Sequence, residues 1–400
     1  MKKIFVMAAL SLAAISCTKS DVLDSPVLNQ EISFTTYLGK APVTKAFIQD
    51  TGTVKKTDYS FSVKAIKYYK GADNKYDTLK GVSPVYMSRK LFYTGSVWRY
   101  DSTLVYWPTD GAALRFVAFG NNVNPTTTTT STPEGGGEPT TTTTTTTNFE
   151  LKSGSHTEYT YTVPASLTDQ QDLIVATTEV LGTDPNADKT AVTLNFYHLL
   201  TRIGFSLISN ADIDVHISEL KLVGNFKTKA SIDLLSETNS AELELTPIEG
   251  NEQDVYTVIN ENNKQTFTPQ FKKDKDDDGK ELETSSPVNV PILGTDATVA
   301  NRYLMIIPQT GANADGKCEI IGTYTIGDDK TPRPIKIDLT SLPALCEQQL
   351  GADDNTQSVY KGFLAGKAYE FVLNVKTEVI SFNVIVDEWD NVDDDFKQKI

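Results

Sequence analysis

The chain has 400 residues and a formal charge of −15, with 52 acidic against 37 basic side chains. An acidic surface repels nucleic acids and anionic membranes, so neither is expected as a partner. The length allows two domains with sizeable cores, and no stretch beyond the N-terminal region is long and apolar enough to predict a membrane-spanning helix.

Residues 1–16 have the layout of a secretion signal. Lys2 and Lys3 form a positive start, and a short apolar run at 4–15 ends in small residues before Cys17. A cysteine at the cleavage point indicates a lipoprotein signal, so we expect Cys17 to carry lipid and to anchor an exported protein at the cell surface. The alternative is an ordinary signal peptide that is cut near Ser16.

Strand patterns dominate the rest of the chain. Apolar and polar residues alternate in short segments that are rich in Val, Ile, Tyr, Phe and Thr and are bounded by Gly, Pro, Asn and Asp. Many short strands separated by turns predict an all-β protein built from β-sandwiches. The expected strands lie at 32–35, 61–66, 114–119, 192–196, 203–207, 220–223, 303–307, 320–326, 369–375 and 380–386.

One segment, 125–147, has low complexity. It consists of threonine runs around a stretch of Pro, Glu and Gly, and it has no apolar residue to bury. We therefore expect a disordered loop that forms a hairpin or crossover excursion between two strands. It would be either a solvated insertion, or a display loop or a site for O-linked sugar.

Residues that could carry catalysis or bind metal are few. The three histidines His156, His198 and His216 have no partners at metal-ligand spacing, and His198 is expected to be a structural residue at a domain junction. The loop from Asp274 to Gly279 matches the first half of a calcium loop, but Ser285 stands where a bidentate Glu is needed. A solvated acidic loop is the better interpretation. We expect no enzyme activity, no metal and no cofactor.

Two cysteines remain besides Cys17. Cys318 and Cys346 form an even pair in a chain that is exported through an oxidising compartment. A disulfide between them is one interpretation, and two buried free thiols are the other.

Six segments of the chain occur in an order that is typical of one family. They are Tyr106-Trp107-Pro108 with the alternating run at 114–119, Asp172-Leu173-Ile174-Val175-Ala176, the run at 192–203, the run at 303–310, Gly366-Lys367-Ala368-Tyr369 and the run at 380–389. Together they resemble the fimbrillin family of Bacteroidetes, the subunits of type V pili.

The resemblance implies two transthyretin-like β-sandwich domains in tandem. After the signal peptide at 1–16, residues 17–45 would form a tether and a removable N-terminal strand, in which Ile32, Phe34 and Thr36 alternate with the residues between them. The N-terminal sandwich would span 46–199 and include the insertion at 125–147. The C-terminal sandwich would span 200–400 and end in a donor strand at about 379–389.

The resemblance also implies an assembly route. A lipoprotein precursor would reach the outer membrane, where a trypsin-like surface protease would cut between Lys45 and Ala46. Lys40 is a competing site, and absence of cleavage is a third option. Removal of the N-terminal strand would open a groove along a sheet edge, and a strand from the next pilin subunit would fill it.

The expected donor strand alternates in the required way. Its apolar face would carry Ile380, Phe382, Val384 and Val386, and Trp389 would follow. The implied function is a structural subunit, stalk or tip, of an adhesive pilus. The alternative is a permanently lipid-anchored surface lipoprotein of the same fold, acting as a pilus anchor or a glycan-binding adhesin.

Overall fold

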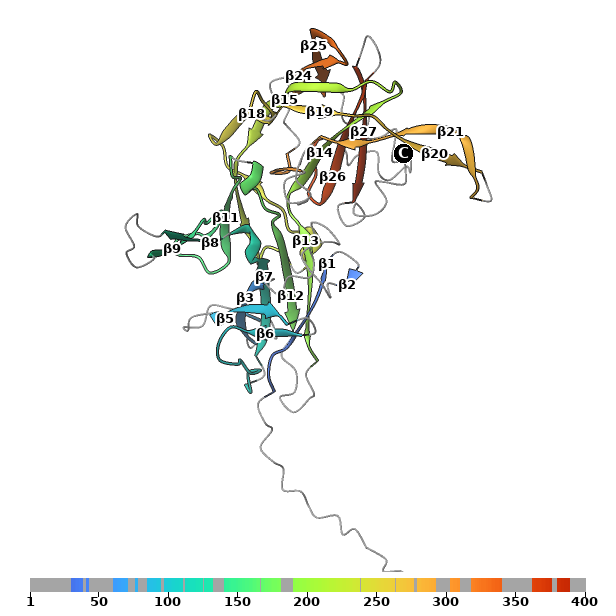
Figure 1. Ribbon diagram of the computed structural model, residues 1–400. Coiled ribbons are helices and arrows are strands. Elements are labelled where there is room, and N and C mark those ends of the chain that lie inside the picture. Colours follow the sequence, from blue (N-terminus) through green and yellow to red (C-terminus); the bar gives the residue numbers. More distant parts are fainter. Residues whose placement is uncertain are drawn as a thin grey trace, which may run out of the picture.

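The fold is seen in a computed structural model of the chain (Figure 1). The residues described are 30–38, 41–42, 60–70, 76–77, 85–94, 97–110, 112–124, 126–131, 140–165, 167–180, 190–237, 239–262, 264–276, 279–292, 303–309, 318–339, 362–375 and 380–388. Within these ranges the regular elements are β-strands and short 3-10 turns, which confirms the all-β prediction. The described part has no helix long and apolar enough to cross a membrane. The 3-10 turns are η1 (Asn121–Val123), η2 (Leu167–Asp169) and η3 (Ser240–Glu242).

A sheet of nine strands forms the N-terminal half. Its central strand β7 (Ala113–Gly120) is largely buried on both faces because its sequence, Ala-Leu-Arg-Phe-Val-Ala-Phe-Gly, is apolar at almost every position. In spatial order the strands are β2 (Ala41–Pro42), β1 (Phe34–Leu38), β13 (Val192–His198), β12 (Ile174–Val180), β7 (Ala113–Gly120), β3 (Ser60–Lys70), β5 (Val85–Tyr93) and β6 (Trp98–Tyr100), with β4 (Tyr76–Asp77) beside β3.

This sheet curls until its two ends meet. β1 and β6 lie near opposite ends of the strand order, yet the ring of Phe34 in β1 is 6.4 Å from the ring of Tyr100 in β6. The residues after β6 also pair with the chain just before β1, through a bridge between Glu31 and Tyr106. Residues 30–38, called the closing segment below, therefore join the two ends of the sheet around a buried core.

A second core lies on the opposite face of the same sheet. There Val117 and Val175 pack against Phe149, Tyr159 and other residues of a four-stranded sheet. The rings of Phe149 and Tyr159 stack with centroids 4.5 Å apart. The four strands are β10 (Phe149–Leu151), β11 (Glu158–Thr162), β16 (Lys229–Asp233) and β17 (Thr246–Pro247).

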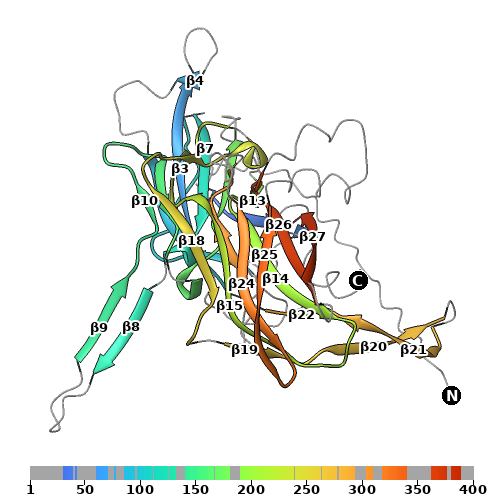
Figure 2. The same ribbon diagram turned by 90° about the horizontal axis from the view of Figure 1, so that it is seen from above.

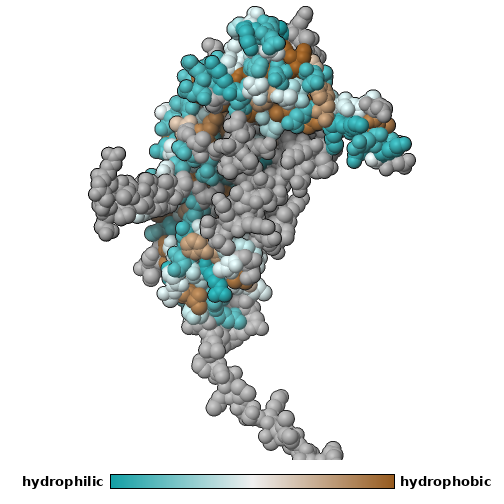
Figure 3. Space-filling view, viewed as in Figure 1, coloured by the Kyte–Doolittle hydropathy of each residue, from teal (hydrophilic) through white to brown (hydrophobic). Residues whose placement is uncertain are grey.

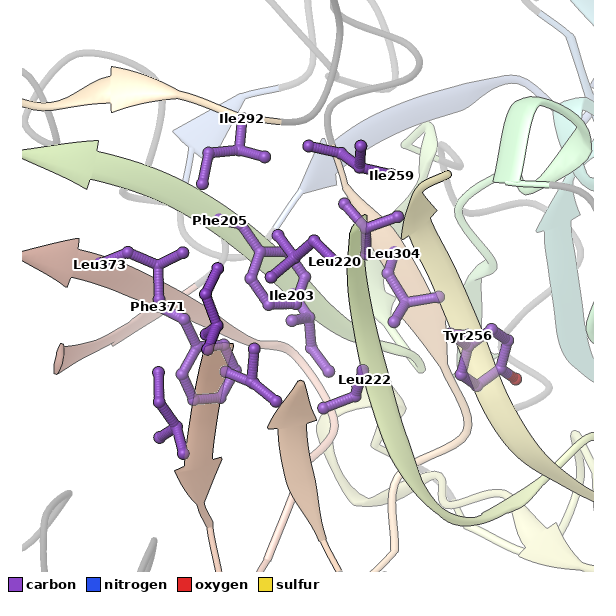
Figure 4. Packing of buried hydrophobic residues seen from close by; sticks show 14 of the residues in the cluster. Ile203, Phe205, Leu220, Leu222, Tyr256, Ile259, Ile292, Leu304, Phe371 and Leu373 are labelled. Carbon is purple, nitrogen blue, oxygen red and sulfur yellow. The ribbon is translucent and has the colours of Figure 1, made fainter. Parts of the chain in front are cut away.

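The C-terminal half is a sandwich of two five-stranded sheets. Figure 4 shows the inward side chains of the two sheets facing one another, with Phe205 and Phe371 on neighbouring strands of one sheet. The rings of these two residues stack, and their centroids are 5.6 Å apart. One sheet holds β22 (Val290–Pro291), β14 (Thr201–Ser209), β26 (Lys367–Val375), β27 (Ile380–Glu388) and β23 (Leu304–Ile306), and the other holds β18 (Glu252–Ile259), β15 (Val215–Lys227), β24 (Glu319–Ile326), β25 (Asp329–Asp338) and β19 (Gln265–Phe267).

Part of the chain after residue 200 belongs structurally to the N-terminal half, on the other side of the domain boundary expected between residues 199 and 200. β13 ends and β14 begins at this point, as the sequence suggested. However, β16 comes later in the chain and pairs with β11 from the first half, and β17 pairs with β16. Residues 229–247 thus complete the N-terminal pair of sheets. The division into two transthyretin-like domains stays a prediction.

The threonine-rich segment differs from the expected disordered loop. Its two arms form a hairpin of β8 (Thr126–Ser131) and β9 (Thr140–Thr145), with six residue pairs, and this hairpin projects from the body of the molecule (Figures 1 and 2). Threonine is β-branched and pairs well across strands, so its strand preference outweighs the missing apolar residues.

We expect Phe371→Ala to lower the free energy of unfolding by roughly 3–5 kcal/mol, because it leaves a cavity in the C-terminal core. The matched control is Phe271→Ala, since Phe271 is 41% exposed while Phe371 is fully buried. The control should change stability by no more than about 0.5 kcal/mol. Denaturant unfolding followed by tryptophan fluorescence and circular dichroism measures both. Equal effects would contradict this packing.

Candidate functional site

The closing segment inserts one row of side chains into the N-terminal core. Ile32, Phe34 and Thr36 are 0%, 7% and 5% exposed, and the residues between them face solvent. This alternation is the one that the sequence predicts for the removable strand. The apolar row belongs to the core cluster of the curled sheet rather than lying on its surface.

Backbone hydrogen bonds hold the closing segment on two sides. On one side β1 runs parallel to β13 over five residue pairs. On the other side the Ile32 amide donates to the Val105 carbonyl at 2.8 Å, and the Trp107 amide donates to the Gln30 carbonyl at 2.9 Å. The segment thus fills a slot between β13 and the chain that follows β6.

Phe34 occupies an aromatic pocket. Its ring makes edge-to-face contacts with Phe61, Phe116 and Tyr100, at centroid distances of 6.2, 5.8 and 6.4 Å. Each such contact contributes about 0.5–1.5 kcal/mol beyond the burial of area. The pocket draws on β3, β7 and β6, so loss of Phe34 would expose apolar surface of three strands at once.

Two residues of β6 bind the closing segment through hydrogen bonds. The Trp98 indole donates to Thr36 Oγ1 at 2.9 Å, and the Tyr100 hydroxyl donates to the Ile32 carbonyl. Burial, with a further contribution from Glu31, raises the pKa of Tyr100 well above its usual value, so the hydroxyl keeps its proton as a donor. The strand β6 is not among those predicted from the sequence. The alternating Trp-Arg-Tyr at 98–100 is the signal that could have revealed it.

Trp107, from the segment Tyr106-Trp107-Pro108, is a large apolar residue of the N-terminal core. Its side chain is 8% exposed, and its ring lies 6.0 Å from that of Phe116. Because its amide also binds Gln30, it packs beside the closing segment and helps to form the slot.

The predicted donor strand forms β27, which pairs with β26 of its own chain over nine residue pairs. Among the described strands it lies at the end of its sheet, with β26 as its neighbour. Val384 is 2% exposed and belongs to the C-terminal core. The register places Ile380, Phe382, Val384 and Val386 opposite Val375, Leu373, Phe371 and Tyr369.

Several predicted site residues lie outside the described part of the chain. They are Cys17, Lys40, Lys45, Ala46, Cys346 and Trp389. Cys318 is described and carries a free, buried thiol. Burial, followed by the nearby charges of Asp338 and Glu319, raises its pKa to about 12, so the thiol stays protonated.

His198 lies at the junction between the two halves. Its Nδ1 is 2.7 Å from Asp172 Oδ2, and both side chains are buried. Nearby, Gly366 has φ of 67° and its amide donates to the Leu200 carbonyl at 3.0 Å. These contacts fix the passage from β13 to β14. Among the described residues there is no group of three or more His, Cys, Asp or Glu side chains that could hold a metal ion.

The acidic loop belongs to a second projecting hairpin, formed by β20 (Gln270–Lys275) and β21 (Glu281–Val288) (Figure 2). Asp276 Oδ1 accepts from the Lys280 amide at 2.8 Å, and Asp274 Oδ1 accepts from the Ser286 hydroxyl at 2.6 Å. Both carboxylates therefore serve hydrogen bonds within the hairpin. On the face shown in Figure 3 this arm is mainly hydrophilic.

The protein-family comparison matches residues 51–389 to a family described as fimbrillin-like, which confirms the family inferred from the six segments. Among solved structures, a fimbrial protein from Bacteroides vulgatus ATCC 8482 is 16% identical, with 90% of this chain and 100% of that chain covered and a TM-score of 0.46. A fimbrial assembly protein from Parabacteroides distasonis ATCC 8503 is 11% identical, with 90% and 99% covered and a TM-score of 0.39. The search of curated proteins gives no match.

We expect Trp98 and Thr36 to be coupled energetically through their hydrogen bond. In a double-mutant cycle with Trp98→Phe and Thr36→Val, the coupling free energy should be about 0.5–1.5 kcal/mol. Thr36→Val conserves shape, so it removes the acceptor without opening a cavity. Denaturant unfolding of the four chains gives the value, and strictly additive effects would contradict the bond.

Proposed function

The chain belongs to the fimbrillin-like family, and from that premise we propose that it is a structural subunit of a type V pilus. Membership implies a structural role at the cell surface or in the fimbrium, with other pilin subunits as partners. The proposal adds the route: removal of the N-terminal strand by a trypsin-like protease, followed by donor-strand exchange. The pilus would serve adhesion.

The observation that carries this proposal is the position of the closing segment. It is the strand at which the two ends of the curled sheet meet, and it supplies Ile32, Phe34 and Thr36 to the core. Its removal would leave the edge of β13 without a partner and would open the aromatic pocket to water. Such an edge strongly favours an incoming alternating strand, which pairs its backbone and refills its pockets.

Sequence order supports a single processing event. The proposed lipid site Cys17 precedes the closing segment, and the proposed cleavage site between Lys45 and Ala46 follows it. One cut there would separate both the lipid and the closing segment from the rest of the chain. A cut at Lys40 would do the same.

A second candidate function follows from the pairing of β27. As long as the closing segment stays, the chain fills its own slot, and β27 completes its own C-terminal sheet. An uncut chain thus needs no strand from a neighbouring subunit at either of these two places. This favours, as the alternative, a permanently lipid-anchored lipoprotein that acts as a pilus anchor or a glycan-binding adhesin.

Limited trypsin treatment of the full-length precursor should yield a mature form that begins at Ala46. This form should then assemble into oligomers that resist SDS and appear as a ladder of bands on a gel. Lys45→Gln should abolish the form that begins at Ala46, because trypsin requires a basic residue before the cut. Lys40→Gln is the matched control and should leave that form unchanged. N-terminal sequencing and gel electrophoresis give the result.

The opposite outcome of the trypsin experiment would contradict the pilus proposal. If the surface protein keeps its Cys17 lipid and stays monomeric after trypsin treatment, the result supports the permanent anchor.

We expect Cys17→Ser to abolish labelling with a radioactive fatty acid and to prevent surface display, because the sulfur is the attachment point of the lipid. Cys346→Ser is the control and should be labelled like the wild type. Labelling of the Cys17→Ser chain would contradict the lipoprotein signal.

A further inference from the structure

The threonine-rich hairpin of β8 and β9 has two uncovered sheet edges. It forms a sheet of its own and projects from the body of the molecule (Figures 1 and 2). In a two-stranded antiparallel sheet, alternate residues of each strand direct their backbone N–H and C=O groups outward. Neither outer edge of this hairpin pairs with another strand in the described part of the chain.

These edges lack the features that normally prevent pairing with another chain. Edge strands are usually protected by charged side chains, prolines or bulges. The six residues of β8 and the six of β9 include no charged residue and no proline, and their register is regular over six pairs. Five of these pairs place Thr opposite Thr, and the sixth is Ser131 opposite Thr140.

The other projecting hairpin is protected. β20 and β21 project on the opposite side of the molecule from β8 and β9 (Figures 1 and 2). Their strands include the charged residues Lys272, Lys273 and Glu281, and β21 contains Pro287. Their register shifts between Lys273 and Lys275. The open edges are therefore a property of the threonine hairpin and not of every arm of this chain.

We propose that the threonine hairpin binds the same hairpin of a second copy of this chain, edge to edge and antiparallel, with β9 against β9. Backbone hydrogen bonds make the contact, and the two hairpins form one four-stranded sheet. β9 is the contact strand because its threonine run is the longer one, with Thr at every position of 140–147. Antiparallel pairing of like strands has two-fold symmetry, so both copies use the same edge.

The side chains fit a second copy in any register that slides the strands by two residues. Each slide again places Thr opposite Thr, the pair that the hairpin already uses internally. An isolated two-stranded hairpin is only marginally stable in water, and three or more strands are needed for a stable sheet. Pairing therefore stabilises both hairpins without requiring an exact distance between the two molecules.

The charge of the chain explains why the contact lies on a projecting arm. Two copies with a formal charge of −15 each repel one another. A strand of six residues is about 20 Å long, whereas the Debye length at physiological ionic strength is about 8 Å. Uncharged strands can thus meet while the acidic bodies stay beyond the range of strong repulsion.

A single contact of this kind is small, so it becomes effective when many copies face one another. Such a surface joins neighbouring molecules side by side. The contact needs neither cleavage nor strand exchange, so it holds whether or not the chain forms a pilus.

Bead clumping tests the contact in a multivalent setting. Beads coated with the uncut full-length chain, attached by its N-terminus, should clump, and turbidity measures the rate. Thr142 and Thr143 are exposed neighbours in the middle of β9. In the two central registers one or the other lies opposite itself in the second copy. Thr142→Lys with Thr143→Lys should slow clumping by about tenfold or more, because like charges directly opposite one another destabilise a strand pair.

A charge swap identifies the partner as a second copy. Thr142→Glu with Thr143→Glu should also stop clumping, but a mixture of Lys-variant and Glu-variant beads should clump again. This rescue also shows that both variants are folded. The matched control is Thr284→Lys with Ser285→Lys, which adds the same charge to exposed residues of the other hairpin and should clump like the wild type.

Three results would overturn the proposal. They are wild-type beads that stay dispersed, Lys-variant beads that clump as fast as the wild type, and a mixture of oppositely charged variants that does not clump. The alternative role as a site for O-linked sugar has its own measurement. Complete trypsin digestion gives a peptide of residues 116–152 that contains the whole hairpin. Its mass in surface-sheared protein should be that of the unmodified sequence, and added hexose masses would overturn the contact, because sugars would cover the edge.

Discussion

The N-terminal half depends on one constraint: a curled sheet whose two ends must be joined. Its interior contains Phe61, Phe116 and Phe196, and these rings are shielded only if the gap between β13 and the chain after β6 is filled. The closing segment fills it with backbone bonds on two sides and with Phe34 in the centre. The other core of this sheet is covered by the four-stranded sheet and does not depend on that segment.

The two halves of the molecule are joined by more than a linker. Met305 and Ile307 from the C-terminal half belong to the core between the nine- and four-stranded sheets. Gln170 bridges the same region, since its side-chain oxygen accepts from the Met305 amide at 2.8 Å and its nitrogen donates to the Pro164 carbonyl at 3.1 Å. Together with the His198–Asp172 contact, this packing makes the junction part of the folded core. In a pilus subunit, such a junction would carry tension through buried contacts.

The sequence predicted the strands better than their partners. Alternation at 114–119 and 192–196 identified β7 and β13, and the inward row of the closing segment was predicted correctly. Strand pairing is non-local, so alternation alone did not reveal the parallel pairing with β13, the role of Trp98 and Tyr100, or the return of residues 229–247 to the first half. The threonine hairpin was missed because composition was weighted above strand preference.

The closing segment has properties suited to a strand that is first held and later lost. Its pairing with β13 is short and parallel, which is slightly weaker per residue than antiparallel pairing. While the chain is uncut, the tether keeps the segment at a high effective concentration beside its slot, so weak pairing suffices. In the proposed route, a cut after the segment would remove that advantage without changing a contact in the slot. A free strand would then compete on its own affinity, and a donor that is covalently part of a folded partner would have the advantage.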